Sequence, residues 1–128
     1  KGNVILRIND GKLSNTRIAN FSWPNLWQHQ SVIELGDLNK DGFNEVALLG
    51  TNKRSNATQL IIKNGNDASE YGRLSFSTTS HKVEIKSFDV NEDGYADIAI
   101  HGIEIAPLSS TISFFSGQDL SLLRKANY

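Results

Sequence analysis

Oxygen-bearing side chains occupy three alternate positions near the start of the segment GDLNKDGFNEVALLG, which begins at Gly36, and a fourth follows at Glu45. The residues concerned, with the glycine that follows the third oxygen ligand, are Asp37, Asn39, Asp41, Gly42 and Glu45. A hard cation such as Ca²⁺ takes about six to eight oxygen ligands, and a loop supplies them by turning side chains 1, 3 and 5 inward. Glycine at position 6 permits a sharp reversal, position 7 offers its carbonyl (here that of Phe43), and a carboxylate at position 9 closes the shell. The spacing therefore predicts a cation-binding loop.

The same pattern returns 52 residues later, in the segment FDVNEDGYADIAIHG. The matching residues are Asp89, Asn91, Asp93, Gly94 and Asp97, and the carbonyl at position 7 is that of Tyr95. Three carboxylates in so short a loop repel one another unless a cation lies between them. Because the donors are all oxygens and the chain has no cysteine, we expect Ca²⁺ rather than Zn²⁺ or copper, at about two ions per chain. The alternative interpretation is a pair of polar Asx turns that bind no metal.

The residues that follow each loop exclude an EF-hand or a dockerin. Both of those motifs need an acidic ligand at position 12, and an EF-hand continues into a helix. Position 12 is Leu48 in the first copy and Ile100 in the second. The short apolar runs EVALLG and DIAIHG are typical of buried strands, so we expect each loop to connect two strands of a hairpin.

The elements that must position these loops are predicted to be strands throughout. Short apolar runs alternate with Gly, Asn and Asp clusters, and helical periodicity is missing. We expect strands near 4–8, 15–21, 31–36, 45–50, 58–63, 72–77, 82–88, 97–103, 110–116 and 121–126. Four-stranded units repeated at this period are typical of propeller blades, so the predicted fold class is all-β, with about two and a half antiparallel propeller-type blades.

The predicted organisation is a single repeat domain over residues 1–128. It consists of a partial blade at 1–28, a first repeat at 29–80 and a second at 81–128. Known propellers close with about four to eight blades. The chain is therefore expected to be part of a longer propeller, one subunit of an oligomeric ring, or a different arrangement of the same units.

The two loop segments resemble the FG-GAP/VCBS repeats of integrin-type β-propellers. The resemblance covers nearly the whole chain and implies that the loop joining the first two strands of each blade binds Ca²⁺. It implies two sites. The first is formed by Asp37, Asn39, Asp41, Phe43 and Glu45, and the second by Asp89, Asn91, Asp93, Tyr95 and Asp97. Two residues depart from the family pattern, since Glu45 replaces the commoner Asp and Phe88 replaces a Gly.

Trp23 and Trp27 stand in the irregular segment WPNLW. Exposed Trp rings stack on sugars or anchor partner proteins, so the pair is a candidate ligand-binding surface. The alternative, which we favour, is that both rings pack at an interface between blades.

Composition excludes several other functions. The net charge of −1 gives no reason to expect nucleic-acid binding. No apolar run approaches the roughly 20 residues of a membrane span, so no membrane insertion is expected. No nucleophile elbow, phosphate loop or dinucleotide motif is present, and no catalytic residue is predicted.

The sequence therefore predicts a calcium-stabilised module of an extracellular or cell-surface protein that binds a protein or polysaccharide, and the resemblance implies a role in adhesion. Two alternatives remain open. The chain could be a non-catalytic or cleft-forming part of a secreted polysaccharide-degrading enzyme, or a self-assembling subunit of a ring or fibre.

Overall fold

The computed structural model confirms the all-β prediction. It describes residues 3–10, 16–24, 27–52, 54, 57–76, 83–105 and 108–127, with side chains within 31–52, 54, 57–75, 83–102 and 110–127. The described residues form ten strands and no helix. The strands are β1 (Asn3–Asp10), β2 (Thr16–Pro24), β3 (Trp27–Glu34), β4 (Val46–Asn52), β5 (Thr58–Lys63), β6 (Glu70–Phe76), β7 (Val83–Phe88), β8 (Asp97–Ile105), β9 (Leu108–Phe115) and β10 (Leu122–Asn127).

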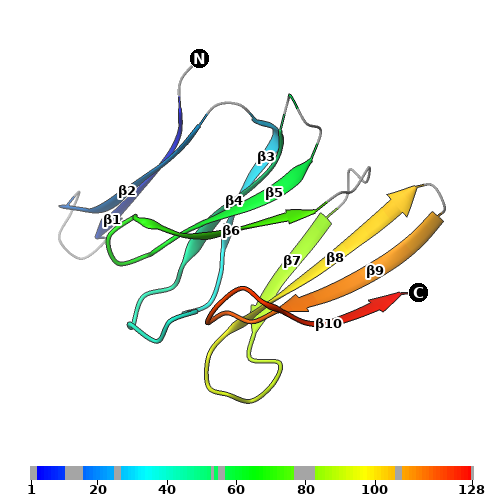
Figure 1. Cartoon of the computed structure of the whole chain (residues 1–128). Helices are drawn as coiled ribbons and strands as arrows, with labels where there is room; N and C mark the ends of the chain where they lie inside the picture. Colours follow the sequence, from blue (N-terminus) through cyan, green and yellow to red (C-terminus); the bar gives the residue numbers. More distant parts are fainter. Residues whose placement is uncertain are drawn as a thin grey trace.

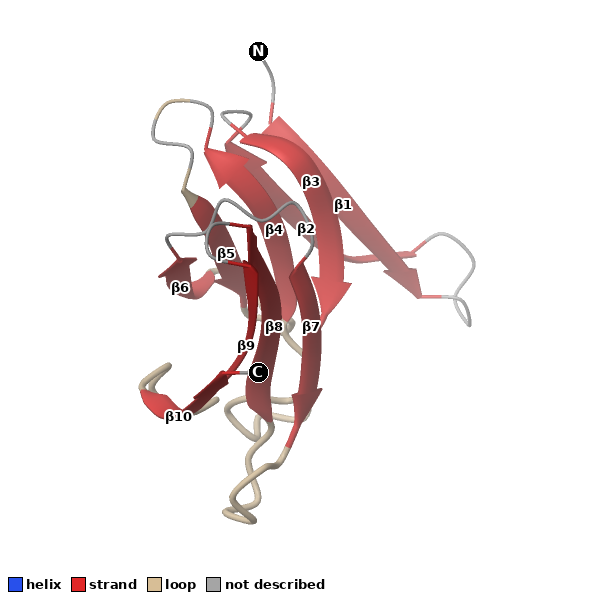
Figure 2. Ribbon diagram, turned by 90° about the vertical axis from the view of Figure 1, so that its right-hand side faces the viewer, coloured by secondary structure: helices blue, strands red, loops and turns tan. Residues whose placement is uncertain are grey.

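Consecutive strands pair antiparallel to form three sheets, which follow one another in a row in Figure 1. The hairpin β1–β2 comes first, then the four-stranded sheet β3–β4–β5–β6, and then the four-stranded sheet β7–β8–β9–β10. The prediction of four-stranded antiparallel blades is thus confirmed. The sheets do not close into a ring, and in Figure 2 they are seen from the side as a curved stack.

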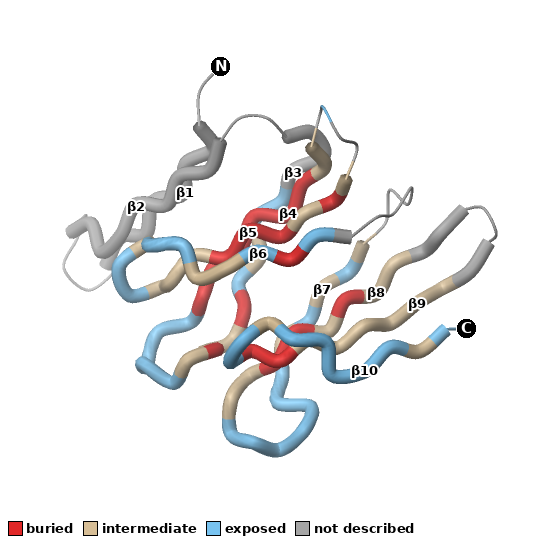
Figure 3. The backbone as a smooth tube through the Cα atoms, in the orientation of Figure 1, coloured by how far each residue is buried: buried red, intermediate tan, exposed pale blue. Residues whose placement is uncertain are grey.

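The apolar core lies between the two four-stranded sheets. It is made of side chains from both, namely Leu35, Leu38, Ala47, Leu49, Leu60, Ile62, Leu74, Ile98 and Ile100. Figure 3 shows that buried residues are concentrated in β4 and β5, whereas β10 is exposed over most of its length. Neighbouring residues of a strand face opposite sides of a sheet. The unbroken run of buried residues from Val46 to Gly50 in β4 therefore means that both faces of the sheet β3–β4–β5–β6 are covered.

The two sheets also meet through their loops and through β6. The amide of Gly36 donates to Ser87 Oγ at 2.8 Å, and a Cβ at Gly36 would lie 2.7 Å from the Cβ of Ala96. A Cβ at Gly72 would lie 2.5 Å from Leu120 Cδ1. Both glycines therefore sit where the two four-stranded units approach each other closely.

A bulge in each outer strand repeats with the same period. Tyr71 falls where the register shifts between β5 and β6, and Leu123 falls at the matching shift between β9 and β10. Such a bulge re-aims a side chain, and the Tyr71 hydroxyl donates to the carbonyl of Gly117 in the other sheet.

Within the described residues, no helix is long and apolar enough to span a membrane.

Candidate metal centre

Each acidic segment connects two neighbouring antiparallel strands, as the sequence predicted. The first loop, residues 35–45, joins β3 to β4, and the second loop, residues 89–96, joins β7 to β8. Both lie along the lower edge of the molecule in Figure 1. The repeat in sequence is therefore also a repeat in structure.

Side-chain oxygens in the first loop hold its backbone in a tight turn. Asp37 Oδ1 and Asn39 Oδ1 both accept from the amide of Asp41, each at 3.1 Å. Asp37 Oδ2 accepts from the amide of Gly42 at 2.9 Å, and Asp41 Oδ1 accepts from that of Phe43 at 2.9 Å. These bonds draw the oxygens at positions 1, 3 and 5 around one point.

The second loop repeats this network bond for bond. Asp89 and Asn91 accept from the amide of Asp93, Asp89 accepts from Gly94, and Asp93 accepts from Tyr95. The distances run from 2.8 to 3.2 Å. Two independent segments thus adopt one hydrogen-bonding pattern.

The backbone conformation repeats as well. Lys40 and Glu92, at position 4, both have a φ of 60°. Gly42 and Gly94, at position 6, have φ values of 92° and 87°. Positive φ at position 6 strains any side chain, which accounts for glycine there in both copies.

The carboxylate at position 9 is buried and bonded to two backbone amides. Glu45 is 0% exposed; its Oε2 accepts from the amide of Leu38 at 2.7 Å and its Oε1 from that of Gly65 at 3.4 Å. Asp97 is 1% exposed; it accepts from Val90 and Gly117, both at 3.0 Å. The longer arm of Glu45 therefore reaches the same two positions as the shorter arm of Asp97.

Burial raises the pKa of Glu45 above its ordinary value. The amides of Leu38 and Gly65 oppose this change, and the negative charges of Asp41 and Asp37 add to it. A divalent cation bound between these carboxylates would offset the two negative charges and lower the pKa of Glu45. The first loop thus concentrates negative charge that a cation would stabilise.

The structure brings three carboxylates together in each loop. Their oxygens lie within 4.8 Å of one another in the set Asp37, Asp41 and Glu45, and again in the set Asp89, Asp93 and Asp97. Carboxylate, amide and carbonyl oxygens suit hard cations. Either cluster could therefore hold a metal ion.

The remaining predicted ligands are less directly placed. Asn39 shares a donor with Asp37, and its Nδ2 donates to Asn64 Oδ1 at 3.2 Å. In the second loop Asn91 Oδ1 accepts from the amide of Asp93, as Asn39 Oδ1 accepts from that of Asp41 in the first. The roles of these two amides, and of the Phe43 and Tyr95 carbonyls, stay predictions.

The sequence predicted a turn after each of the strands near 58–63 and 110–116, but not that these turns cover the position-9 carboxylates. Residues 64–69 and 116–121 follow β5 and β9 and have the same internal bonds, including Ser69 and Ser121 donating to Asp67 and Asp119. A Cβ at Gly65 would lie 1.9 Å from the carbonyl oxygen of Asn44, and one at Gly117 would lie 1.7 Å from that of Ala96. The signal was available, because these glycines are also 52 residues apart.

Trp23 and Trp27 belong to β2 and β3, but their side chains lie outside the part of the chain whose side chains the structure describes. The candidate ligand-binding surface that they would form stays a prediction.

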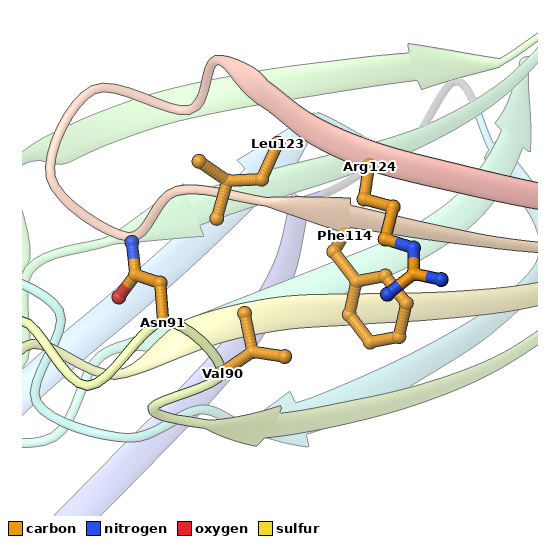
Figure 4. A pocket seen from close by; sticks show the side chains of 5 residues that line it. All are labelled: Val90, Asn91, Phe114, Leu123 and Arg124. Atoms are coloured by element: carbon orange, nitrogen blue, oxygen red, sulfur yellow. The ribbon is translucent and has the colours of Figure 1, made fainter.

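A hollow of about 330 Å³ lies beside the second loop. It is lined by Val90, Asn91, Phe114, Leu123 and Arg124. Figure 4 shows Val90 and Leu123 pointing toward each other across it. Val90, Phe114 and Leu123, together with Phe88, which is 48% exposed, form an apolar surface on the side of the sheet β7–β8–β9–β10 that faces this hollow.

Comparison with known proteins gives one result for the region that holds both loops. A family model described as an FG-GAP-like repeat matches residues 37–100, half of the chain. No curated protein and no solved structure matches the chain.

Proposed function

The chain belongs to the FG-GAP-like repeat family, and we propose that its two acidic loops bind Ca²⁺ and thereby stabilise a β-propeller-like binding module. The observation that carries this proposal is the repeated cluster, in which three carboxylates lie within 4.8 Å of one another in both loops. The donor set, free of cysteine and rich in oxygen, supports Ca²⁺ over softer metals. The oxygens at positions 1, 3, 5, 7 and 9 of each loop would hold the ion.

In this proposal the cation has a structural role. It would neutralise the carboxylates and fix each loop against the turn that packs on it, through the buried Glu45 or Asp97. Calcium sites of extracellular modules bind at about 10⁻⁴ to 10⁻³ M. Such affinity suits permanent occupancy outside the cell, which supports an extracellular or cell-surface location.

We propose that the module binds a protein or polysaccharide partner, with a role in adhesion, and does not catalyse a reaction. The uncovered apolar side of the sheet β7–β8–β9–β10, with Phe88 and Leu123 exposed by 48% and 40%, supports contact with another macromolecule. Binding to immobilised matrix proteins and polysaccharides, compared in Ca²⁺ and in EDTA, tests this part. Turnover of a polysaccharide that a point substitution in this chain abolishes would contradict it.

The calcium sites are tested by thermal unfolding and calorimetry. At ten times its Kd a ligand stabilises the folded state by about 1.4 kcal/mol per site, and about 1–10 mM Ca²⁺ gives that excess for a Kd of about 10⁻⁴ to 10⁻³ M. We therefore expect Ca²⁺ in the millimolar range to raise the melting temperature, EDTA to lower it, and calorimetry to detect about two ions per chain.

Variants locate the effect. Asp41→Ala and Asp93→Ala should each remove one binding event, whereas Glu84→Ala, an exposed acidic residue of β7 outside both loops and the turns that pack on them, should leave binding unchanged. An unsubstituted chain that melts at the same temperature with and without the chelator would refute the proposal.

A further inference from the structure

The lysine of the first loop reaches across to the second loop. Lys40 Nζ lies 4.4 Å from the centroid of the Tyr95 ring. A Cβ at Gly94 would lie 2.5 Å from Nζ and 3.1 Å from Cε of the same lysine. An ammonium group is attracted to the face of an aromatic ring, so the Tyr95 ring holds the charge of Lys40 against the second loop.

The first loop lacks such a neighbour in the part of the chain that the structure describes. Nothing lies within 4 Å of a Cβ placed at Gly42, the residue that matches Gly94. The residue that matches Lys40 is Glu92, which carries the opposite charge. The two loops have the same internal bonds but different electrostatic surroundings.

The charge of Lys40 is near the second cluster and is not neutralised there. Among the described residues, the close contacts between a basic and an acidic side chain are Arg73–Glu70 and His101–Glu84, and neither involves Lys40. Gly94 contacts the lysine on one side, and its amide donates to Asp89 Oδ2 at 2.8 Å. With ordinary bond lengths, Nζ therefore lies within about 8.5 Å of that oxygen, which is close to one Debye length in physiological salt.

We propose that Lys40 lowers the Ca²⁺ affinity of the second loop and so makes the two sites unequal. This inference rests on the proposed calcium sites. A divalent ion in the second loop is repelled by the fixed ammonium group, and at this distance in a largely aqueous setting the repulsion changes affinity by about two- to fivefold. The first loop of the chain thus controls the cation affinity of the second.

The experiment measures each loop alone by calorimetric Ca²⁺ titration at low salt. Asp41→Ala leaves the second loop as the site, and Asp93→Ala leaves the first. Adding Lys40→Met, which keeps the unbranched stem and removes the charge, should tighten binding to the second loop by about two- to fivefold and affect the first loop less. In 1 M KCl, where the Debye length is about 3 Å, the gain should largely disappear.

Three further variants separate charge at this place from other causes. Lys40→Arg keeps the charge and should keep the weaker affinity. Tyr95→Leu keeps the loop carbonyl and the net charge but removes the ring under Lys40, so it should show part of the gain. Lys125→Met, on β10, changes net charge equally and should not tighten the second loop.

The outcomes distinguish this inference from the proposed function. Equal changes in both loops, or no change in either, would overturn the role of Lys40 while leaving the calcium sites in place. Failure of the unsubstituted chain to bind Ca²⁺ would overturn both.

Discussion

Glu45 and Asp97 combine two tasks that are usually separate. Each faces a candidate cation position, and each accepts hydrogen bonds from two backbone amides that belong to different hairpins. A carboxylate oxygen has two lone pairs, so it can accept a hydrogen bond from an amide and also coordinate a cation. These residues therefore link the loop to the turn whether or not a cation is bound.

We expect Glu45→Gln to destabilise the metal-free protein by about 1–3 kcal/mol. The substitution is nearly isosteric, but one side-chain oxygen becomes an NH₂ group facing a buried amide donor, which leaves a hydrogen bond unmade. Urea unfolding in EDTA measures this loss without a contribution from Ca²⁺.

Asp41→Asn is the matched control for that variant. Asp41 is exposed, and an Asn side chain can still accept from the amide of Phe43, so the change in EDTA should stay within about 0.5 kcal/mol. Equal midpoints for Glu45→Gln and the unsubstituted chain would show that the buried carboxylate does not link the two hairpins.

At this scale the sequence predicted the acidic residues of both clusters but not the bonds of the buried pair. Alternating spacing within one loop is local information, and it places Asp37, Asp41 and Glu45 together. The bond from Gly65 to Glu45 spans 20 residues and depends on how two hairpins approach each other. No local pattern encodes that approach.

At the scale of elements, loop and turn form one unit in each sheet. The β3–β4 loop and the β5–β6 turn contact each other so closely that Gly65 has room for no side chain. The β7–β8 loop and the β9–β10 turn repeat this contact at Gly117. A glycine in a turn is often explained by its φ value, but here the cause is the carbonyl of the neighbouring loop.

Gly65→Ala and Gly117→Ala should each destabilise the protein by about 3 kcal/mol, the upper end of the usual cost of overpacking. A methyl group within 2 Å of a backbone oxygen forces the loop and the turn apart, because backbone cannot rotate away as a side chain can. Chemical unfolding measures the loss.

Gly102→Ala provides the control, since nothing among the described residues lies within 4 Å of a Cβ at this strand position. Alanine there should be neutral or stabilise by up to about 1 kcal/mol. If all three alanine variants unfold at the same denaturant concentration, the close approach of loop and turn is not a constraint.

The strands themselves were largely predictable. All ten overlap the ranges expected from the sequence, although several are longer than expected: β1 spans Asn3–Asp10 and was expected at 4–8. Boundaries shifted because cross-strand hydrogen bonds, which extend a strand beyond its apolar residues, depend on the partner. The bulges at Tyr71 and Leu123 are register shifts of the same kind and leave no local signature.

At the scale of the whole molecule, a shared core and a few contacts between loops hold the two four-stranded sheets together. Tyr71 is the clearest of these contacts, because its hydroxyl donates to the carbonyls of Gly117 and Gln118. Burial raises the pKa of Tyr71, with the charges of Glu45 and Asp119 adding to the effect. The phenol therefore stays a protonated donor over the physiological range of pH.

Tyr71→Phe should cost about 1 kcal/mol of stability and should speed hydrogen exchange in the turn at 116–121, which the hydroxyl holds against β6. Tyr95→Phe serves for comparison, because the Tyr95 hydroxyl makes no hydrogen bond to a described residue and the ring under Lys40 is kept. Unchanged exchange in the turn of the Tyr71→Phe variant would mean that the Tyr71 hydroxyl does not hold this turn against β6.

The period of 52 residues predicted two similar sheets, but not how each one is covered. Val90 and Leu38 occupy the same position in their repeats, yet Leu38 is fully buried and Val90 is 38% exposed. The difference comes from a neighbouring sheet that packs on one and not on the other. A sequence read repeat by repeat does not contain that information.

Two glycines that lie against the neighbouring four-stranded unit make the repeats non-interchangeable. Gly36 and Gly72 leave room for Ala96 and Leu120 of the next sheet, but their counterparts in the second repeat are Phe88 and Arg124. A tandem duplication of the second repeat would therefore not nest as the natural pair does. An engineer who wished to lengthen the array would first have to restore glycine at positions 88 and 124.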